Sequence, residues 1–228
     1  MTALSKKFKA TMDATSAIDV TTATIATFNK LAQPYQDKYM DLADYDDTYD
    51  IFCSHLPRPD AEVLELACGP GNVTRALLRR LPGLKILATD LAPQMVELAR
   101  INNPAASVKL MDSRDFISLQ QQFDAIVCAF GLPYLSADEA AKLIADASQV
   151  LTAGGLLYLS TMEGDPSQSA YQTSSSGDQV YIHYHRAPYL LAALAQHGFT
   201  LLDLRRKPGP VNASMPSTDL FLIARRAA

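Results

Sequence analysis

Apolar residues follow two different periods along this chain, and the change falls near residue 59. Across residues 21–55 they recur every three or four positions, which predicts helix with an interruption at Pro34. From Glu62 onward, short apolar runs of strand length alternate with longer amphipathic stretches. We therefore expect an N-terminal helical cap at residues 21–58 and one larger domain at residues 59–228.

The larger domain is predicted to alternate strands with helices. Apolar runs predict five successive strands, at Glu62–Ala67, Lys85–Thr89, Val108–Met111, Phe123–Ala129 and Leu156–Thr161. Helical periodicity between them predicts helices at Val73–Leu81, Pro93–Ile101 and Ala137–Leu151, with the last one stopped by Gly154 and Gly155. Strands that alternate with helices pair in parallel, and their helices cover both faces of the sheet.

The C-terminal part follows a different plan. A predicted helix at Ala187–His197 precedes two predicted strands, Phe199–Leu204 and Asp219–Ala224, which are joined only by a turn-rich loop. Parallel neighbours need a long crossover, so we expect the last strand to run antiparallel to its neighbour. The expected fold class is α/β: a doubly wound seven-stranded sheet, mostly parallel, with an antiparallel last strand and the N-terminal helical cap.

The composition narrows the class of partner. Net charge is −4 and the pI is near 5.5, which disfavours a nucleic-acid partner, because binding to phosphates needs a basic surface. No apolar run approaches the roughly 20 residues of a membrane span, so no membrane partner is expected. Residues 1–20 look like a flexible tail without the apolar stretch of a secretory signal. Three widely spaced cysteines fit neither a disulfide framework nor a metal pattern, and a cytoplasmic location is expected.

The strongest motif is E-L-A-C-G-P-G-N, residues 65–72, at the exit of the first predicted strand. Gly69 and Gly71 allow a tight turn and a close approach of the backbone to a ligand, because neither has a Cβ. The following helix directs its free N–H groups toward that ligand. Asp90 follows the second strand, where a carboxylate can accept both hydroxyls of an adenosine ribose. The motif therefore predicts a nucleotide-like ligand at the carboxyl ends of the strands.

Two other interpretations compete with this one. The turn could simply join strand to helix, although the acidic residues that follow argue against this. The ligand could also be a nicotinamide dinucleotide, whose G-x-G-x-x-G fingerprint has a third glycine for helix packing. Thr74 occupies that third position here, and Glu65 is foreign to the fingerprint.

Together, four motifs resemble those of the class I S-adenosylmethionine-dependent methyltransferases: E-L-A-C-G-P-G-N, A-T-D, F-D-A-I-V-C-A-F and L-T-A-G-G-L-L-Y-L-S-T. The resemblance covers about residues 59–228 and implies a Rossmann-like fold with S-adenosylmethionine as cofactor. It assigns Asp90 to the ribose, and it assigns the methionine end to Glu65, Ala67, Cys68, Gly69 and Gly71. It further implies that Leu91 and Met95 pack against the adenine, that Asp112 and Ser113 bond to it, and that Ala129 and Phe130 lie beside the methionine amine. Asn72 departs from the pattern, since many members have a third glycine there.

The resemblance does not identify the methyl acceptor. Tyr134, His183 and His185 are candidate catalytic or acceptor-lining residues, and each is equally compatible with a packing or surface role. Tyr35 and Tyr39 are four residues apart on a predicted helix, where they either close over the cofactor or pack against the core. The polar segment 162–177 is predicted to be a long loop that either faces the substrate or is simply solvated. No metal is expected, because the two histidines lack a third ligand.

The expected function is methyl transfer to a small-molecule acceptor by in-line displacement, with a general base needed only if the nucleophile must lose a proton. A noncatalytic binder or sensor of S-adenosylmethionine remains an alternative, because the sequence contains no obligatory catalytic residue. An NAD-dependent reductase is a further alternative that shares the sheet and the ribose carboxylate. The sequence leaves the acceptor atom and the oligomeric state open.

Overall fold

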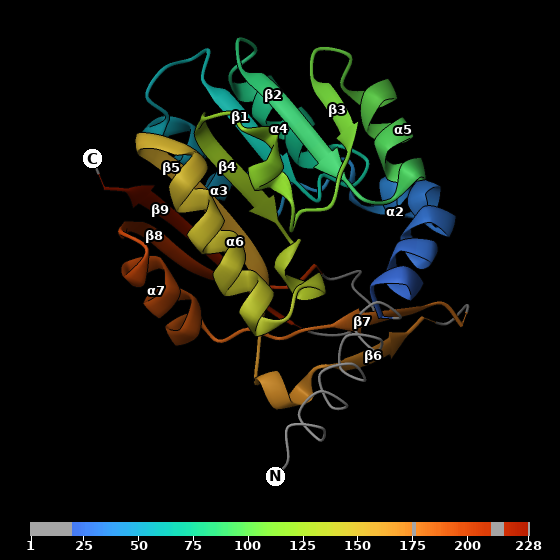
Figure 1. Cartoon of the computed structure of the whole chain (residues 1–228). Helices are drawn as coiled ribbons and strands as arrows, with labels where there is room; N and C mark the ends of the chain where they lie inside the picture. The colour runs from blue at the N-terminus through green and yellow to red at the C-terminus, as the bar shows by residue number, and fades with distance from the viewer. Residues whose placement is uncertain (1–19, 175–176, 211–216, 228) are drawn as a thin grey trace.

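The computed structural model of the chain describes residues 20–174, 177–210 and 217–227. Within these residues, seven strands form one sheet in the spatial order β3-β2-β1-β4-β5-β9-β8, and a hairpin, β6–β7, forms a separate two-stranded sheet (Figure 1). The strands of the large sheet are β1 (Glu62–Leu66), β2 (Lys85–Asp90), β3 (Ser107–Leu110), β4 (Phe123–Ala129), β5 (Leu151–Glu163), β8 (Phe199–Pro208) and β9 (Thr218–Arg226).

The sequence of strands and helices produces the expected doubly wound topology. Strands β1 to β5 pair in parallel, while β9 runs antiparallel to both of its neighbours, β5 and β8. The antiparallel last strand is confirmed, and it lies inside the sheet rather than at its edge. The connecting helices are α4 (Asn72–Arg80), α5 (Pro93–Asn102), α6 (Ala137–Val150) and α7 (Ala187–Gln196).

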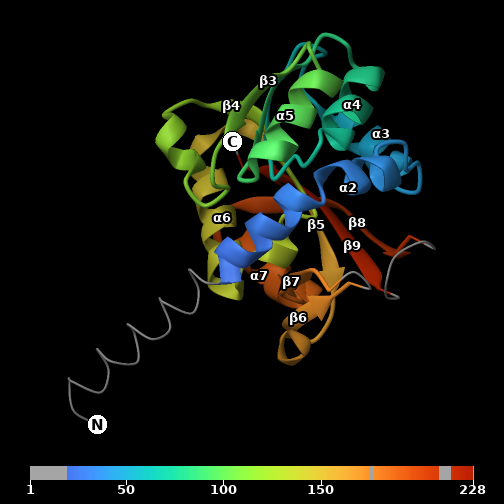
Figure 2. The same cartoon turned by 90° about the vertical axis from the view of Figure 1, so that its right-hand side faces the viewer.

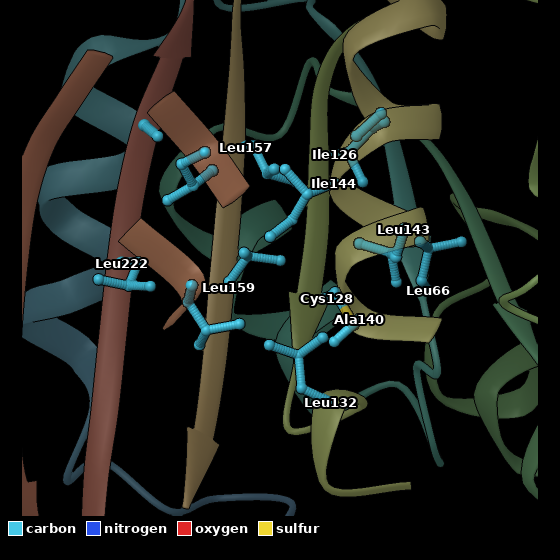
Figure 3. Packing of buried hydrophobic residues seen from close by; sticks show 14 of the residues in the cluster. Leu66, Ile126, Cys128, Leu132, Ala140, Leu143, Ile144, Leu157, Leu159 and Leu222 are labelled. Carbon is cyan, nitrogen blue, oxygen red and sulfur yellow. The ribbon is translucent and has the colours of Figure 1, made fainter. Parts of the chain in front are cut away.

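Two apolar cores lie on opposite faces of the sheet, because side chains alternate along each strand. On one face, α6 and α7 pack against side chains of β1, β4, β5 and β9. Figure 3 shows this core, with Ile126, Cys128, Leu157 and Leu159 from the sheet and residues of α6 beside them. On the other face, α3 (Asp46–His55), α4 and α5 cover the alternate residues of the same strands. Figure 1 shows the two helical layers.

The N-terminal helices differ in where they pack. The helix of residues 20–30 continues into α2 (Ala32–Tyr39) with a break at Leu31. Pro34 lies in the first turn of α2, so the break falls three residues before the predicted interruption, because proline has no N–H to bond to the carbonyl of Lys30. By contrast, α3 packs on the sheet through Phe52, which is fully buried.

The helix of residues 20–30 joins two distant parts of the chain. The Asn29 side chain accepts a hydrogen bond from the backbone N–H of Gln94 at the start of α5, at 2.8 Å. The Thr27 hydroxyl donates to the carbonyl of Gln179 in the hairpin, at 2.7 Å. Figure 2 shows the helix running from α2 toward β7. The helix therefore bridges the start of α5 and the hairpin.

Two predicted boundaries need correction. β5 begins at Leu151, not Leu156, and it runs through the glycine pair that was predicted to stop α6. The glycines instead accommodate a register shift against β4, where Gly154 has φ +75°. The polar segment after Met162 is not one long loop, because it contains η3 (Pro166–Gln168) and β6 (Ala170–Thr173), and β6 pairs with β7 (Gln179–Ile182). The predicted tail lies outside the described residues up to residue 19.

Candidate functional site

A cavity of about 920 Å³, including its open mouth, lies at the carboxyl ends of the parallel strands. Small-molecule sites in open α/β sheets typically lie at this place. Its wall includes most of the residues that the sequence motifs singled out: Ala67, Gly69, Asp90, Leu91, Met95, Asp112, Ser113, Ala129 and Phe130. Tyr35 and Tyr134 also lie on this wall, so strands far apart in the sequence and the N-terminal helices meet at one site.

The turn after β1 and the end of β2 are joined by hydrogen bonds to one carboxylate. The backbone N–H of Gly69 donates to Asp90 Oδ2 at 2.9 Å, and that of Ala92 donates to Oδ1 at 2.8 Å. Burial raises the pKa of Asp90, and these backbone N–H groups oppose that effect. Gly69 has φ +55°, and the nearest atom to a Cβ placed on it is 3.8 Å away, on the Tyr35 ring. The Gly69 backbone therefore lies open to the cavity.

Two cavity residues other than glycine have left-handed backbones. Ala67 and Phe130 both have φ +53°, a conformation that costs about 1–2 kcal/mol for an L-residue and gathers at functional sites. Ala67 follows β1, and Phe130 follows β4. The Phe130 N–H is held by the hydroxyl of Ser160 on β5, at 3.0 Å, and Ser160 is 1% exposed.

Gly71 has a different role from Gly69. It caps α4 with φ +83°, and a Cβ here would come within 2.2 Å of the Asn103 side chain. Asn103 donates to the Gly71 carbonyl at 2.9 Å, and Asn102 donates to the Pro70 carbonyl at 2.8 Å. These two hydrogen bonds hold the glycine turn against the end of α5. Sequence reasoning missed this pair, although two adjacent asparagines at a helix end were a usable signal.

Glu65 lies beneath the turn and is not part of the cavity wall. Its side chain is 1% exposed and accepts a hydrogen bond from the Thr74 hydroxyl at 2.5 Å. Burial raises the pKa of Glu65 to about 8. Thr74 is therefore a polar partner in the position where a dinucleotide fingerprint has its packing glycine. Cys68 is also buried and off the wall.

Asp112 and Ser113 reach the cavity from the segment after β3, together with Arg114. The Arg114 guanidinium bonds both Asp112 oxygens, at 2.9 and 2.5 Å, and contacts Glu139 at 3.0 Å. This pairing holds the pKa of Asp112 below its ordinary value. Asp112 therefore reaches the wall as an ionised carboxylate whose orientation Arg114 fixes. No sequence motif singled out Arg114.

Three tyrosine predictions have separate outcomes. Tyr35 and Tyr134 lie on the cavity wall, and the Phe28 ring stands nearly perpendicular to both, at 6.0 and 5.0 Å between centroids. Tyr39 is not on the wall and packs against Tyr35, with centroids 4.6 Å apart. Tyr35 therefore faces the cavity, whereas Tyr39 packs behind it.

The two histidines are not part of the cavity wall. His185 is 2% exposed, and its Nε2 lies 2.9 Å from the carbonyl oxygen of Leu132. His183 is partly buried and packs against the Tyr181 ring, with centroids 4.8 Å apart. Burial lowers the pKa of both rings. His185 thus ties the segment after β7 to the segment after β4, which is a structural role.

The described residues contain no cluster of three or more potential metal ligands, and none of their helices is long and apolar enough to cross a bilayer. The fold and site define a class: a doubly wound domain with a glycine turn after β1 and a carboxylate at the end of β2, which fits an adenosine-containing ligand.

Comparison with known proteins narrows this class. Residues 63–155 match the family model described as a methyltransferase domain. A ubiquinone biosynthesis O-methyltransferase of Xanthomonas campestris is 30% identical over 126 residues, which are 53% of this chain and 51% of the relative. A demethylmenaquinone methyltransferase of Deinococcus radiodurans is 34% identical over 110 residues, which are 46% of this chain and 44% of the relative. The chain spans about half the length of the curated relatives it matches.

Solved structures share the fold. A Burkholderia thailandensis 1,6-didemethyltoxoflavin-N1-methyltransferase, solved with 1,6-didemethyltoxoflavin and S-adenosylhomocysteine, has a TM-score of 0.68 and 22% identity, covering 91% of this chain and 88% of its own. A [4+2]-cyclase has a TM-score of 0.61 and 16% identity, covering 80% of this chain and 81% of its own. The fold alone therefore does not determine the reaction. The sequence comparisons therefore show that residues 63–155 are similar to a methyltransferase domain, and the matched relatives are named methyltransferases.

Proposed function

We propose that this chain transfers the methyl group of S-adenosylmethionine to a small-molecule acceptor. The observation that carries the proposal is the joint presentation of Gly69 and Asp90 on one cavity wall, linked by a 2.9 Å hydrogen bond. An open backbone beside a carboxylate fits the aminoacyl and ribose parts of one extended ligand. The names of the matched relatives, both methyltransferases, support the same reaction.

The wall residues would divide the contacts to this ligand among them. Asp90 would accept the ribose hydroxyls, while Leu91 and Met95 would pack against the adenine. Asp112, fixed by Arg114, would accept the adenine amino group, and the Ser113 N–H would bond a ring nitrogen. Ala67, Gly69, Ala129 and Phe130 would surround the methionine end, whereas Glu65, Cys68 and Gly71 would support the turn from beneath.

The chain's own contribution is binding, alignment and exclusion of water. When bound, S-adenosylmethionine supplies a methyl group already activated by its sulfonium centre. Transfer then depends on holding the nucleophile in line with that methyl group. The helix of residues 20–30 and Tyr134 border the same cavity and would shield the reacting atoms from water.

The proposal is tested by turnover with labelled S-adenosylmethionine against phenol, heteroaromatic nitrogen, amine, thiol and carboxylate acceptors. We expect labelled product from at least one class, and roughly tenfold or greater loss in Asp90→Asn. Label retained only in unreacted S-adenosylmethionine across the whole panel, with tight binding intact, would support a noncatalytic sensor. One observation favours that alternative: within the described residues, neither histidine nor lysine lies on the cavity wall.

We also propose that the acceptor is not a nucleic acid and that the protein works in the cytoplasm. The net charge of −4 supports the first statement, since a phosphate-binding surface is usually basic. Three free cysteines, two of them buried, support a reducing compartment. Filter binding with duplex and single-stranded oligonucleotides tests the first point, with no retention expected at physiological salt.

A further inference from the structure

Part of the cavity wall is not made by the methyltransferase motifs. We call this part the acceptor half, and its residues come from the helix of residues 20–30, from the segment after β4 and from β7. They are Val20, Thr21, Thr24, Ile25, Phe28, Tyr134, Leu135 and Tyr181. Apart from the two threonines, all are aliphatic or aromatic. This inference rests on the proposed function, because it concerns what lies beside the methyl donor.

The rings of the acceptor half form a corner. The Phe28 and Tyr134 rings have centroids 5.0 Å apart and planes inclined by 81°. The Tyr181 ring packs against the rings of Tyr171 and His183, with centroid distances of 5.2 and 4.8 Å. A flat ring entering such a corner can stack on one face and meet the other edge-on, which are the two favourable aromatic geometries.

Within the described residues, the acceptor half has no charged side chain that could pair with a charged acceptor. The charged side chains on the cavity wall are Asp90, Asp112 and Arg114, and all three lie outside the acceptor half. Asp90 is bonded by two backbone N–H groups, and Arg114 is paired with Asp112 and Glu139. A charged acceptor would therefore be desolvated without compensation, which is costly.

The proton of the acceptor is not removed by a strong base here. Besides the two threonine hydroxyls, the polar side-chain groups of the acceptor half are the phenols of Tyr134 and Tyr181. Burial raises the pKa of Tyr134, so its hydroxyl stays neutral and can only form hydrogen bonds near pH 7. The nucleophile must then release its proton to water. Phenolic hydroxyls and ring N–H groups do so far more readily than aliphatic alcohols.

We propose that the acceptor is an uncharged, planar aromatic molecule whose hydroxyl or ring nitrogen is methylated while its ring lies in the corner that Phe28 and Tyr134 form. A lone pair of that oxygen or nitrogen forms the new bond to the methyl carbon. The carbon–sulfur electron pair returns to sulfur, which yields S-adenosylhomocysteine, and the proton of the acceptor passes to water. The Tyr134 hydroxyl makes no other hydrogen bond within the described residues and is available to orient the acceptor.

The test uses three matched probes in the presence of saturating S-adenosylhomocysteine. They are 2-naphthol, which is planar and neutral, decahydro-2-naphthol, which is saturated, and 6-hydroxy-2-naphthoate, which is charged. Binding is measured by saturation-transfer NMR and calorimetry for the wild type, Phe28→Leu and the control Tyr189→Leu. Tyr189 is 40% exposed and is not on the cavity wall.

We expect 2-naphthol to bind at least about tenfold more tightly than the saturated probe or the charged probe. Phe28→Leu should reduce that preference to roughly threefold or less with unchanged affinity for S-adenosylhomocysteine, while Tyr189→Leu keeps it. Equal or tighter binding of the saturated or charged probe, an unchanged preference in Phe28→Leu, or no binding of any probe would overturn this inference. If S-adenosylhomocysteine itself fails to bind, the proposed function fails instead, so the two failures are distinguishable.

Discussion

The backbone N–H of Gly69 donates to Asp90 Oδ2 at 2.9 Å and so ties the turn after β1 to the end of β2. The two residues are 21 positions apart in the sequence and share the cavity wall. The bond fixes the carboxylate without using all of its lone pairs, since an ionised carboxylate accepts about four hydrogen bonds. Asp90 can therefore hold the turn and accept ligand hydroxyls at the same time.

Replacing Asp90 with Asn should weaken binding of S-adenosylhomocysteine by roughly tenfold or more. The amide keeps one oxygen for a backbone N–H but removes the charge and one acceptor oxygen. Calorimetric titration measures the affinity, and circular dichroism verifies that the fold persists. The matched control is Asp115→Asn, an exposed acid that follows β3 and lies off the cavity wall. If Asp90→Asn binds as tightly as this control, Asp90 is not a ligand residue.

Gly69→Ala and Gly71→Ala should separate binding from stability. Both place a Cβ on a left-handed backbone, at about 1–2 kcal/mol each. At Gly69 the methyl group meets the cavity, so ligand affinity falls most. At Gly71 it displaces the Asn103 side chain, so an additional ~1–3 kcal/mol of stability is lost. Urea unfolding and titration compare the two variants. The reverse order of effects would contradict the roles assigned to these glycines.

Most of the sheet could be predicted because several of its strands are short apolar runs near glycine or proline. β1, β2 and β4 were expected within one residue of their observed ends, and Asp90 followed from its place after β2. Such runs are set by burial on both faces, which a single sequence displays directly.

The rest depends on tertiary contacts. β6 is mainly exposed, so it lacks the apolar signal of a strand, and its pairing with β7 is not visible in the sequence. His183 and His185 were candidates because histidine is chemically versatile. The burial of His185 and its contact with Leu132 depend on residues far apart in the sequence, so the sequence pattern does not show them. The same holds for Arg114, whose two acidic partners come from different elements.

Ser160→Ala should weaken ligand binding through Phe130. The variant leaves the partly buried Phe130 N–H without its partner, which costs roughly 1–3 kcal/mol and frees Phe130 from its left-handed conformation. Ser160→Thr, which restores the hydroxyl, should recover affinity. Thr48→Val is the control, because Thr48 bonds the Tyr158 hydroxyl at 2.9 Å, away from the cavity wall. Equal losses of affinity in Ser160→Ala and Thr48→Val would indicate general destabilisation instead.

Glu65 should make stability depend on pH. Burial raises its pKa from 4.5 to about 8, so the folded protein holds a proton near neutrality that the unfolded chain releases. The stabilisation of the folded state by this bound proton is complete below about pH 4.5 and is lost as pH rises toward 8. Glu65→Gln should therefore gain stability relative to the wild type between pH 5 and 8, on the order of a few kcal/mol. The glutamine can still accept the Thr74 hydroxyl.

Urea unfolding of both proteins at several pH values measures this difference. Glu62→Gln, on the same strand but partly exposed, controls for loss of a carboxylate. A constant difference between Glu65→Gln and the wild type from pH 5 to 8 would show that Glu65 is ionised in the folded protein.

The central claim is that the cavity between Gly69, Asp90 and Phe130 binds S-adenosylmethionine. Calorimetric titration of the wild-type chain with S-adenosylhomocysteine tests it most directly. We predict one site per chain, with a Kd in about the micromolar range, and at least roughly tenfold weaker binding in Asp90→Asn. The absence of binding at several hundred micromolar (about −5 kcal/mol) would contradict it, above all if NADH bound to the same protein.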